Sequence, residues 1–344
     1  MDLFYQSKRD KLGHNMIFVR LIICIFFLSL VTNLPSEDKN NYLDNPEVLS
    51  FIEFMQKKHG FLKKELTELF SSARFQEKVI RIMNRQPEGT MTWYQYKEMM
   101  VTKERANSGE FFINSYREDL KRAEDIYGVP AEVIASIIGI ETRYGKITGN
   151  IRVIDSLATL SFNYPRREKF FRKQLEEFIL LGREESLDIK KIKGSIAGAM
   201  GYGQFMPDSY RKYAVDFDFD GRRDILNNPI DAIGSVANFL SKKGKWEPNT
   251  EIVLKAKVLK NQSPNVKSSF KPHMTVRELK KIGLEPFSRL SRNTLVVPIE
   301  LEGEKGKEYW LGLKNYHALS RYNRSKLYIM AVAEFSYSLE NFFY

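Results

Sequence analysis

Residues 129–145 read VPAEVIASIIGIETRYG, and this stretch is predicted to form the helix around which the chain is organised. Pro130 suits the first helical position, and Gly145 suits the residue that ends a helix. Isoleucines recur at helical spacing from Ile134 onward, which predicts a face that packs inward. Glu141 lies seven residues after Ile134 and therefore belongs to the same inward stripe.

Glu141 is the first candidate functional residue. A carboxylate among isoleucines costs free energy unless it is paired or has a use. Burial is expected to keep the Glu141 carboxyl protonated near neutrality, which is what a general acid requires. The structural alternative is that Arg143, Tyr144 or a distant basic residue pairs with Glu141. Both interpretations stay open at this point.

Composition sets broad limits on the protein class. A chain of 344 residues can hold two or three domains, and 43% hydrophobic with 13% aromatic residues fits a globular protein. The excess of 54 basic over 43 acidic residues gives a net charge of +11, which favours an anionic partner such as nucleic acid, a membrane surface or an acidic cell wall. The single cysteine, Cys24, excludes an intrachain disulfide and a cysteine metal cluster.

The N-terminal residues 1–35 have the pattern of an export signal. Lys8, Arg9 and Lys11 precede an apolar run from Leu21 to Val31, which is short for a membrane span. An uncleaved anchor is the alternative, because further apolar residues precede Arg20. Cys24 lies inside the apolar run and not after it, so lipidation there is not expected.

The body of the chain is predicted to be mainly helical. Residues 36–127 are expected to form one N-terminal helical domain: 36–46 are polar and are expected to be a linker, and from Pro46 to about Tyr127 the pattern is helical, interrupted by Gly60, by 87–89 and by Gly109. Residues 128–245 contain the central helix and two more amphipathic patterns, at 171–184 and 229–244.

A small β-containing module is predicted at 246–304. Residues 250–259 and 293–303 alternate as strands do, and 275–283 is expected to be a short helix. Residues 305–344 are expected to return to the helical core, first as strand and turn and then as a helix at 324–339.

Residues 194–208 read GSIAGAMGYGQFMPD, a glycine-rich loop that lets a bulky ligand approach the backbone. It lacks the lysine of a phosphate loop and is not a nucleophile elbow. Ser195, Tyr202, Gln204 and Phe205 supply a hydroxyl, a phenol, an amide and a ring, which suit a sugar-binding wall. A tightly packed turn would use the same glycines.

The stretch 216–224, DFDFDGRRD, is a candidate calcium loop. Asp216, Asp218 and Asp220 occupy positions 1, 3 and 5, a glycine occupies position 6, and Arg222 would offer its carbonyl oxygen at position 7. Position 12 is not the usual glutamate, and Asp231, four residues later, is the expected substitute. Neutralisation of these carboxylates by Arg222 and Arg223 is the competing structural interpretation.

Five motifs occur here in the order seen in the membrane-bound lytic murein transglycosylase B family, which the chain resembles from about residue 45 to 344. They are GIETRYG, LATLSFNYPRR, GSIAGAMGYGQFMP, DFDFDG with DAIGSVANFL, and YWLGLKNYHALSRYNRSKLYIMAV. The resemblance implies a mainly α (α+β) fold, with a lysozyme-like helical core at 128–245, an N-terminal helical domain at 36–127 and a small inserted β domain.

The resemblance also implies a reaction. Family members cut peptidoglycan between N-acetylmuramic acid and N-acetylglucosamine, and Glu141 would be the single acid/base that yields a 1,6-anhydro product without consuming water. Substrate-binding residues implied by the resemblance are Ser195, Gln204, Phe205, Tyr322, Asn323 and Tyr328. Tyr202, as part of the sugar-compatible loop, and Arg166, which follows Pro165 and could face an anionic ligand, join them from the residues themselves. A solvated pair of charges, Arg166 with Arg167, is the alternative for the latter. Implied calcium ligands are Asp216, Asp218, Asp220, Arg222 and Asp231, with no organic cofactor.

The expected setting is the periplasm, with peptidoglycan strands as the partner and other cell-wall enzymes as further candidates. Membrane association, at the inner or outer membrane, is expected only through an uncleaved N-terminal segment. Nucleic acid is not an expected partner, because no RNA- or DNA-reading motif is present. A non-catalytic peptidoglycan-binding protein and a muramidase-type hydrolase are the alternative functions.

Overall fold

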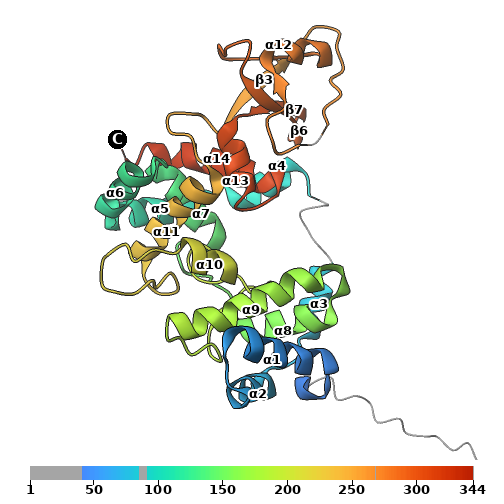
Figure 1. The fold of residues 1–344 in the computed structure, drawn as a ribbon. Coiled ribbons are helices and arrows are strands. Elements are labelled where there is room, and N and C mark those ends of the chain that lie inside the picture. Colours follow the sequence, from blue (N-terminus) through green and yellow to red (C-terminus); the bar gives the residue numbers. More distant parts are fainter. Residues whose placement is uncertain (1–40, 85–90, 268, 344) are drawn as a thin grey trace, which may run out of the picture. The chain divides into compact units, whose positions relative to one another are not determined.

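The computed structural model describes residues 41–84, 91–267 and 269–343 (Figure 1). Residues Lys39–Tyr344 form one compact unit. The expected signal or anchor segment at 1–35 lies outside the described residues. Among the described residues, no helix combines the length and the apolar character that crossing a bilayer requires.

Helix α7 (Ala131–Thr142) is almost completely buried. All of its residues are buried except Glu132 and Glu141, which are half-buried. Pro130 directly precedes it as the N-cap residue. Its packing partners are α5 (Lys103–Ser115), α6 (Arg117–Tyr127), α11 (Pro229–Phe239) and α14 (Lys326–Glu340), and α14 also contacts α4 (Trp93–Met100).

The helix ends earlier than Gly145, the residue that was expected to stop it. Arg143 already adopts a left-handed conformation, with φ of 50°. Tyr144 and Gly145 follow with φ of 59° and 83°. Glu141 therefore sits in the last turn of α7, one residue before a run of three positive φ values, two of them at non-glycine residues, which seldom adopt them.

A second group of helices surrounds α8 (Val153–Asn163) and α9 (Glu168–Glu184). It consists of α1 (Pro46–His59), α2 (Lys63–Ser72), α3 (Glu77–Met83), the 3₁₀ turns η1 (Tyr42–Asp44) and η3 (Pro165–Arg167), and α10 (Pro207–Tyr213). Buried polar contacts join its parts. The Tyr42 hydroxyl is 3.1 Å from Thr159 Oγ1, and the backbone N–H of Arg74 donates to Asp155 (2.9 Å).

This packing divides the stretch that was expected to be one N-terminal helical domain. Residues 42–83 pack on α8 and α9, whereas α4, α5 and α6 pack around α7 and α14. The periodicity of this stretch predicted the helices. It could not show which element each apolar helix face packs against.

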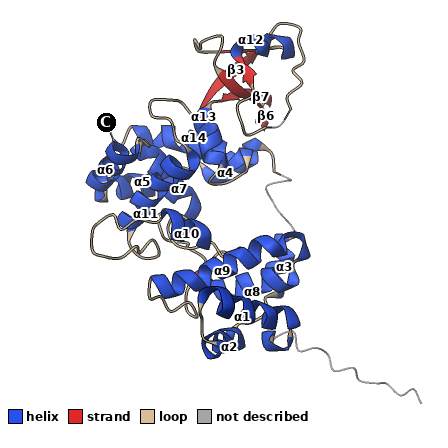
Figure 2. Cartoon of the chain, viewed as in Figure 1, coloured by secondary structure: helices blue, strands red, loops and turns tan. Residues whose placement is uncertain are grey.

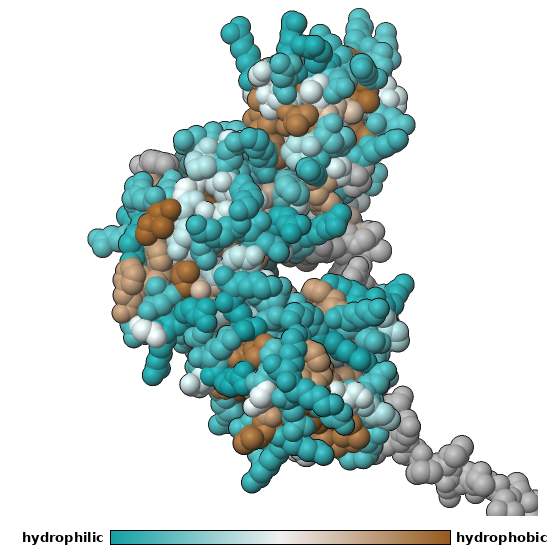
Figure 3. All heavy atoms as spheres, viewed as in Figure 1, coloured by the Kyte–Doolittle hydropathy of each residue, from teal (hydrophilic) through white to brown (hydrophobic). Residues whose placement is uncertain are grey.

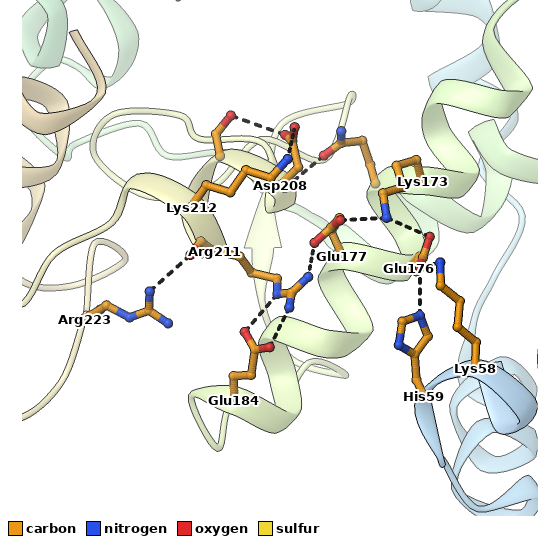
Figure 4. A network of polar contacts seen from close by, with 12 residues as sticks. Lys58, His59, Lys173, Glu176, Glu177, Glu184, Asp208, Arg211, Lys212 and Arg223 are labelled. Atoms are coloured by element: carbon orange, nitrogen blue, oxygen red, sulfur yellow. Dashed lines mark hydrogen bonds and ion pairs between the residues drawn. The ribbon is translucent and has the colours of Figure 1, made fainter. Parts of the chain in front are cut away.

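Buried carboxylates on α9 hold α1 and α10 to it (Figure 4). Glu176 accepts hydrogen bonds from Lys58 (3.0 Å), His59 (2.7 Å) and Lys173 (3.0 Å). Glu177 pairs with Lys173 (2.8 Å) and with Arg211 of α10. Each carboxylate is thus satisfied by more than one cation, which offsets the cost of its burial.

Glu176 is expected to make the fold sensitive to acid. Burial opposes ionisation, yet the three hydrogen bonds lower the pKa of Glu176 to about 2 from its ordinary 4.5. On acidification the unfolded chain therefore takes up this proton first, so the stabilisation is complete above about pH 4.5 and disappears as the pH falls towards 2. Glu176→Gln is expected to lower the free energy of unfolding by on the order of 2 kcal/mol at neutral pH and to flatten its acid dependence.

Melting temperatures measured between about pH 6 and pH 3 check this expectation. Glu53→Gln is the matched control, because Glu53 lies on α1 and makes an exposed ion pair with Lys57 (3.7 Å). If the melting temperatures of the wild type and of Glu176→Gln fell in parallel as the pH was lowered, Glu176 would not be the source of the acid sensitivity.

Strands β3 to β7 form a small five-stranded antiparallel sheet (Figure 2). Its order is β4 (Met274–Thr275), β6 (Leu295–Gly303), β7 (Gly306–Gly312), β3 (Val253–Val258) and β5 (Leu284–Pro286). The turn after Gly303 sets the β6–β7 register, in which Ile299 pairs with Trp310. The short helix α12 (Val276–Leu279) and the turn η5 (Lys280–Ile282) connect β4 to β5.

The sheet extends past residue 304, where the module was expected to end. β7 is one of its central strands, so the module continues to Gly312. Residues Lys314–Ser320 then form helix α13 and not the expected strand and turn. The apolar residues of this segment are spaced closely enough to fit either period, and packing against α14 and the π-helical turn η4 (Leu240–Gly244) decides in favour of the helix.

Two further elements concern the loops near α7. β1 (Ile151–Arg152) and β2 (Lys193–Gly194) form a short antiparallel pair that joins the segment after α7 to the glycine-rich loop. The surface seen in Figure 3 is mostly hydrophilic, with hydrophobic residues in small separate patches.

Candidate active site

Glu141 lies where α7 reaches solvent. Its side chain is half-buried, while its neighbours Ile138, Ile140 and Thr142 are buried. Thr142 ends the helix, and the left-handed residues that follow, from Arg143, stop it from continuing past Glu141 by more than one residue. A partly hidden carboxyl at the end of a rigid helix can exchange protons with a ligand while keeping a fixed position.

Two tyrosines lie beside Glu141, Tyr328 buried and Tyr322 half-buried. Tyr328 lies in the first turn of α14, and Tyr322 lies in the loop that precedes it. Their rings are stacked, with centroids 6.5 Å apart and planes 8° apart. Burial of the hydroxyls raises the pKa of both well above 10, and the negative charge of Glu141 raises them further. Both phenols are therefore neutral beside the carboxyl, and Tyr328 is the one that can donate to it, because Tyr322 donates its single proton to Gly203.

The glycine-rich loop approaches the same tyrosines. The Tyr322 hydroxyl donates to the backbone oxygen of Gly203, and a Cβ at this glycine would come within 2.9 Å of that hydroxyl. Phe205 is buried and packs edge-on against Tyr322, with centroids 5.9 Å apart. The loop thus brings Phe205 into the cluster with Tyr322, Tyr328 and Glu141.

Ser195 and Gln204 shape this loop from within. Ser195 Oγ accepts hydrogen bonds from the N–H groups of Ala197 (3.3 Å) and Ala199 (3.0 Å), so it closes a tight turn. Gln204 has a φ of 51°, and its Nε2 donates to the backbone oxygens of Thr148 and Gly201, both at 3.0 Å. Their side chains hold the loop in shape beside α7.

The other three expected ligand contacts lie on different elements. Tyr202 packs over Gly145 and lines a pocket beside α5. Asn323 is half-buried directly after Tyr322. Arg166 is exposed in η3.

Two residues near the cluster were missing from the expected set. Tyr96 of α4 is buried and close enough to Tyr328 to affect its pKa. Phe239 at the end of α11 packs edge-on against Tyr322, with centroids 4.9 Å apart. The sequence marks both as aromatic residues on helices, but such residues are usually core, and nothing in the pattern shows that they lie near Glu141.

Three carboxylates lie close together where the acidic loop 216–224 leads into α11. Oxygens of Asp216, Asp218 and Asp231 all lie within 4.8 Å of one another. Asp231 is fully buried, and burial raises its pKa. Its two oxygens accept hydrogen bonds from the N–H groups of Phe217 and Asp224, both at 2.7 Å.

The remaining loop residues shape the turn. Gly221 has a φ of 89°, and its N–H donates to Asp216 (2.8 Å). Asp220 accepts from the N–H of Arg222 (2.8 Å), and Asn228 donates to Asp218 (2.7 Å). A set of oxygen donors with three converging carboxylates fits a hard cation such as calcium, since without one the carboxylates repel.

The chain is similar to known proteins over most of its length. A family model described as "Transglycosylase SLT domain" matches residues 44–337. The chain is 40% identical over 301 residues to membrane-bound lytic murein transglycosylase B of Escherichia coli K12, covering 85% of this chain and 82% of the relative.

Two solved structures are similar over most of their length. Soluble lytic transglycosylase SltB1 from Pseudomonas aeruginosa has a TM-score of 0.81 and 41% identity, covering 86% of this chain and 99% of the other. The Escherichia coli lytic transglycosylase Slt35 in complex with calcium has a TM-score of 0.81 and 40% identity, covering 88% and 95%.

Proposed function

The chain belongs to the transglycosylase SLT domain family and is a peptidoglycan lytic transglycosylase, and from this premise we propose that Glu141 is its single general acid/base. One observation supports this role above all. Glu141 is a half-buried carboxyl at the end of a buried helix, and its charge acts on two neighbouring phenols, those of half-buried Tyr322 and buried Tyr328.

In the first step Glu141 acts as an acid. Its carboxyl proton passes to the glycosidic oxygen between N-acetylmuramic acid and N-acetylglucosamine, and the bond from that oxygen to C1 of the muramoyl residue breaks. The acetamido oxygen of the same sugar stabilises the positive charge that develops at C1. The N-acetylglucosamine side leaves with the proton on its new hydroxyl.

In the second step Glu141 acts as a base. The carboxylate takes the proton of the muramoyl C6 hydroxyl, and O6 bonds to C1 to close a 1,6-anhydro ring. Glu141 is protonated again, and no water has been consumed. Neutral Tyr328 lies beside the carboxylate while it is charged, and a donor of this kind favours the ionised form. Tyr322 donates its proton to Gly203 and so holds the glycine-rich loop next to this group.

This chemistry accounts for a site built on one carboxyl. Hydrolytic glycosidases ordinarily place two carboxyl groups across the scissile bond, one as the acid and one as the base or nucleophile. Here the substrate supplies both the nucleophile and the group that stabilises C1. From the family's sequence motifs and the sugar-compatible residues of the chain, we also propose substrate contacts at Ser195, Tyr202, Gln204, Phe205, Tyr322, Asn323, Tyr328 and Arg166.

Product analysis tests the proposal. Purified protein incubated with peptidoglycan sacculi is expected to release soluble muropeptides whose masses correspond to 1,6-anhydromuramoyl ends. Release of reducing muramoyl ends would make the protein a muramidase-type hydrolase. Binding to sacculi without soluble products would make it a non-catalytic peptidoglycan-binding protein.

We also propose that the acidic loop binds a structural calcium ion through Asp216, Asp218, Asp220, Asp231 and the carbonyl of Arg222. The converging carboxylates support a cation there, and the similar Slt35 structure is in complex with calcium. The ion would neutralise these carboxylates and fix the segment that leads into α11. No role in the reaction steps is assigned to it.

Calcium is expected to raise the melting temperature. An ion that binds the native state alone adds about 2.7 kcal/mol at a concentration 100 times its Kd. Calorimetry with excess calcium and with a chelator measures the difference, and Asp216→Asn is expected to reduce it. Equal melting temperatures, with no metal bound after exhaustive calcium loading, would show that the loop is held by its own hydrogen bonds.

The setting follows from the function. The substrate lies outside the cytoplasmic membrane, so we propose that residues 1–35 direct export and that the protein works in the periplasm. The named Escherichia coli relative is membrane-bound. Here an uncleaved N-terminal segment would be the means of attachment at the membrane.

A further inference from the structure

A pocket of about 350 Å3 lies beside the turn that ends α7. Its lining includes Asn107, Ser108 and Phe111 of α5, Tyr116, Lys146 and Tyr202. Ligand sites commonly have volumes of 300–1,000 Å3 and combine apolar walls with a few polar groups. This pocket has both features.

The apolar walls are aromatic. Phe111 is 76% exposed, so its ring is open to a ligand. Tyr116 packs against Phe112, with centroids 4.9 Å apart, and so presents a fixed ring. The ring of Tyr202 covers Gly145, where a Cβ would come within 2.2 Å of it, so its orientation is fixed as well.

The polar groups lie next to these rings. Asn107 and Lys146 are exposed, and Lys146 Nζ donates to Ser108 Oγ (3.4 Å). An amide, a hydroxyl and an ammonium group beside exposed aromatic faces suit a sugar, whose ring has an apolar C–H face and a rim of hydroxyl and acetamido groups. The ammonium group also suits the carboxylates that a peptidoglycan strand carries.

Short stretches of chain and one hydrogen bond link the pocket to the proposed active site. Lys146 follows Glu141 by five residues, and Tyr202 precedes Gln204 by two. The Thr142 hydroxyl, in the last turn of α7, donates to the backbone oxygen of Tyr202 (2.9 Å), which joins the two loops directly. A long polymer bound at Glu141 would therefore have this surface within reach.

Given the proposed function, we infer that this pocket binds an amino-sugar segment of the glycan strand, away from the bond that Glu141 cleaves. Phe111 would stack on a sugar ring, while Asn107 and Lys146 would contact its substituents. Such a site holds a polymeric substrate during cleavage, so its contribution to substrate affinity would grow with the length of the strand.

A larger pocket of about 560 Å3 along α6 gives a useful contrast. Charged groups of its lining pair with one another, for example Lys121 with Asp125 (3.2 Å) and with Glu124 (3.9 Å). It therefore lacks the combination of exposed rings and available polar groups that favours a sugar beside α5.

The test uses the Glu141→Gln protein, so that binding is measured without cleavage. Chitotetraose, a chain of N-acetylglucosamine units, is titrated while nuclear magnetic resonance follows the backbone amides of Lys103–Ser115. We expect shift changes in this segment, and at least tenfold weaker binding there when Phe111→Ala is added. Phe287→Ala is the matched control, since this ring is 66% exposed in the β module.

Each outcome decides between alternatives. Unchanged α5 signals, equal binding with and without Phe111, or binding of the free stem peptide in place of the sugar would overturn the inference. Anhydro products from sacculi together with unchanged α5 signals would refute this pocket but leave the proposed function intact. Retained cleavage by Glu141→Gln would refute the proposed mechanism and leave the pocket to be judged by the titration.

Discussion

Glu141→Gln is expected to lower the rate of muropeptide release from sacculi by about a thousandfold or more. The amide has the shape of the carboxyl but can neither give a proton to the glycosidic oxygen nor take one from the C6 hydroxyl. General acid–base catalysis contributes roughly 10²–10⁴-fold, and here one group performs both transfers. Because the side chain is only half-buried, the melting temperature is expected to change little.

Glu132 offers a matched control on the same helix. It is the other half-buried glutamate of α7, and burial raises its pKa, but it lies in the first turn of the helix. Glu132→Gln is expected to keep wild-type activity. Substantial turnover by Glu141→Gln, or an equal loss in both variants, would remove Glu141 from the role proposed for it.

Asp231→Ala is expected to lower the free energy of unfolding by about 3–5 kcal/mol, even with calcium removed. The fully buried carboxylate accepts two backbone hydrogen bonds, from Phe217 and Asp224. Each donor left unsatisfied costs about 1–3 kcal/mol, and the truncated side chain leaves space behind it. Urea unfolding in the presence of a chelator measures this loss.

Asp220→Ala is the comparison within the same loop. Asp220 is exposed, and its carboxylate caps the N–H of Arg222. Its removal is expected to cost less than about 1 kcal/mol in chelator. If Asp231→Ala and Asp220→Ala unfolded at the same urea concentration, the buried hydrogen bonds of Asp231 would not hold this segment.

The sequence predicted most reliably those elements whose local pattern has one solution. The apolar stretch at 129–145 predicted α7, and the alternation at 250–259 and 293–303 predicted β3 and β6. The segment Lys314–Ser320 and the partners of α1–α3 were not predictable in this way. Tertiary packing decided both, and packing depends on residues distant in the chain.

The same limit applies to the candidate site. Glu141 was recognisable because a carboxylate among isoleucines needs an explanation. Its exposure was not, since that depends on where α7 ends and on the left-handed turn at Arg143. Nothing local places Tyr96 near Tyr328, or shows that Ser195 and Gln204 hydrogen-bond to the backbone of their own loop.

The most direct measurement of the central claim is digestion of sacculi in water enriched in oxygen-18. If the C6 hydroxyl of the substrate attacks C1 under the control of Glu141, the new muramoyl ends are expected to carry no label and to have the mass of the 1,6-anhydro form. Labelled reducing ends would show that water is the nucleophile, and would contradict a mechanism that needs one carboxyl and no water.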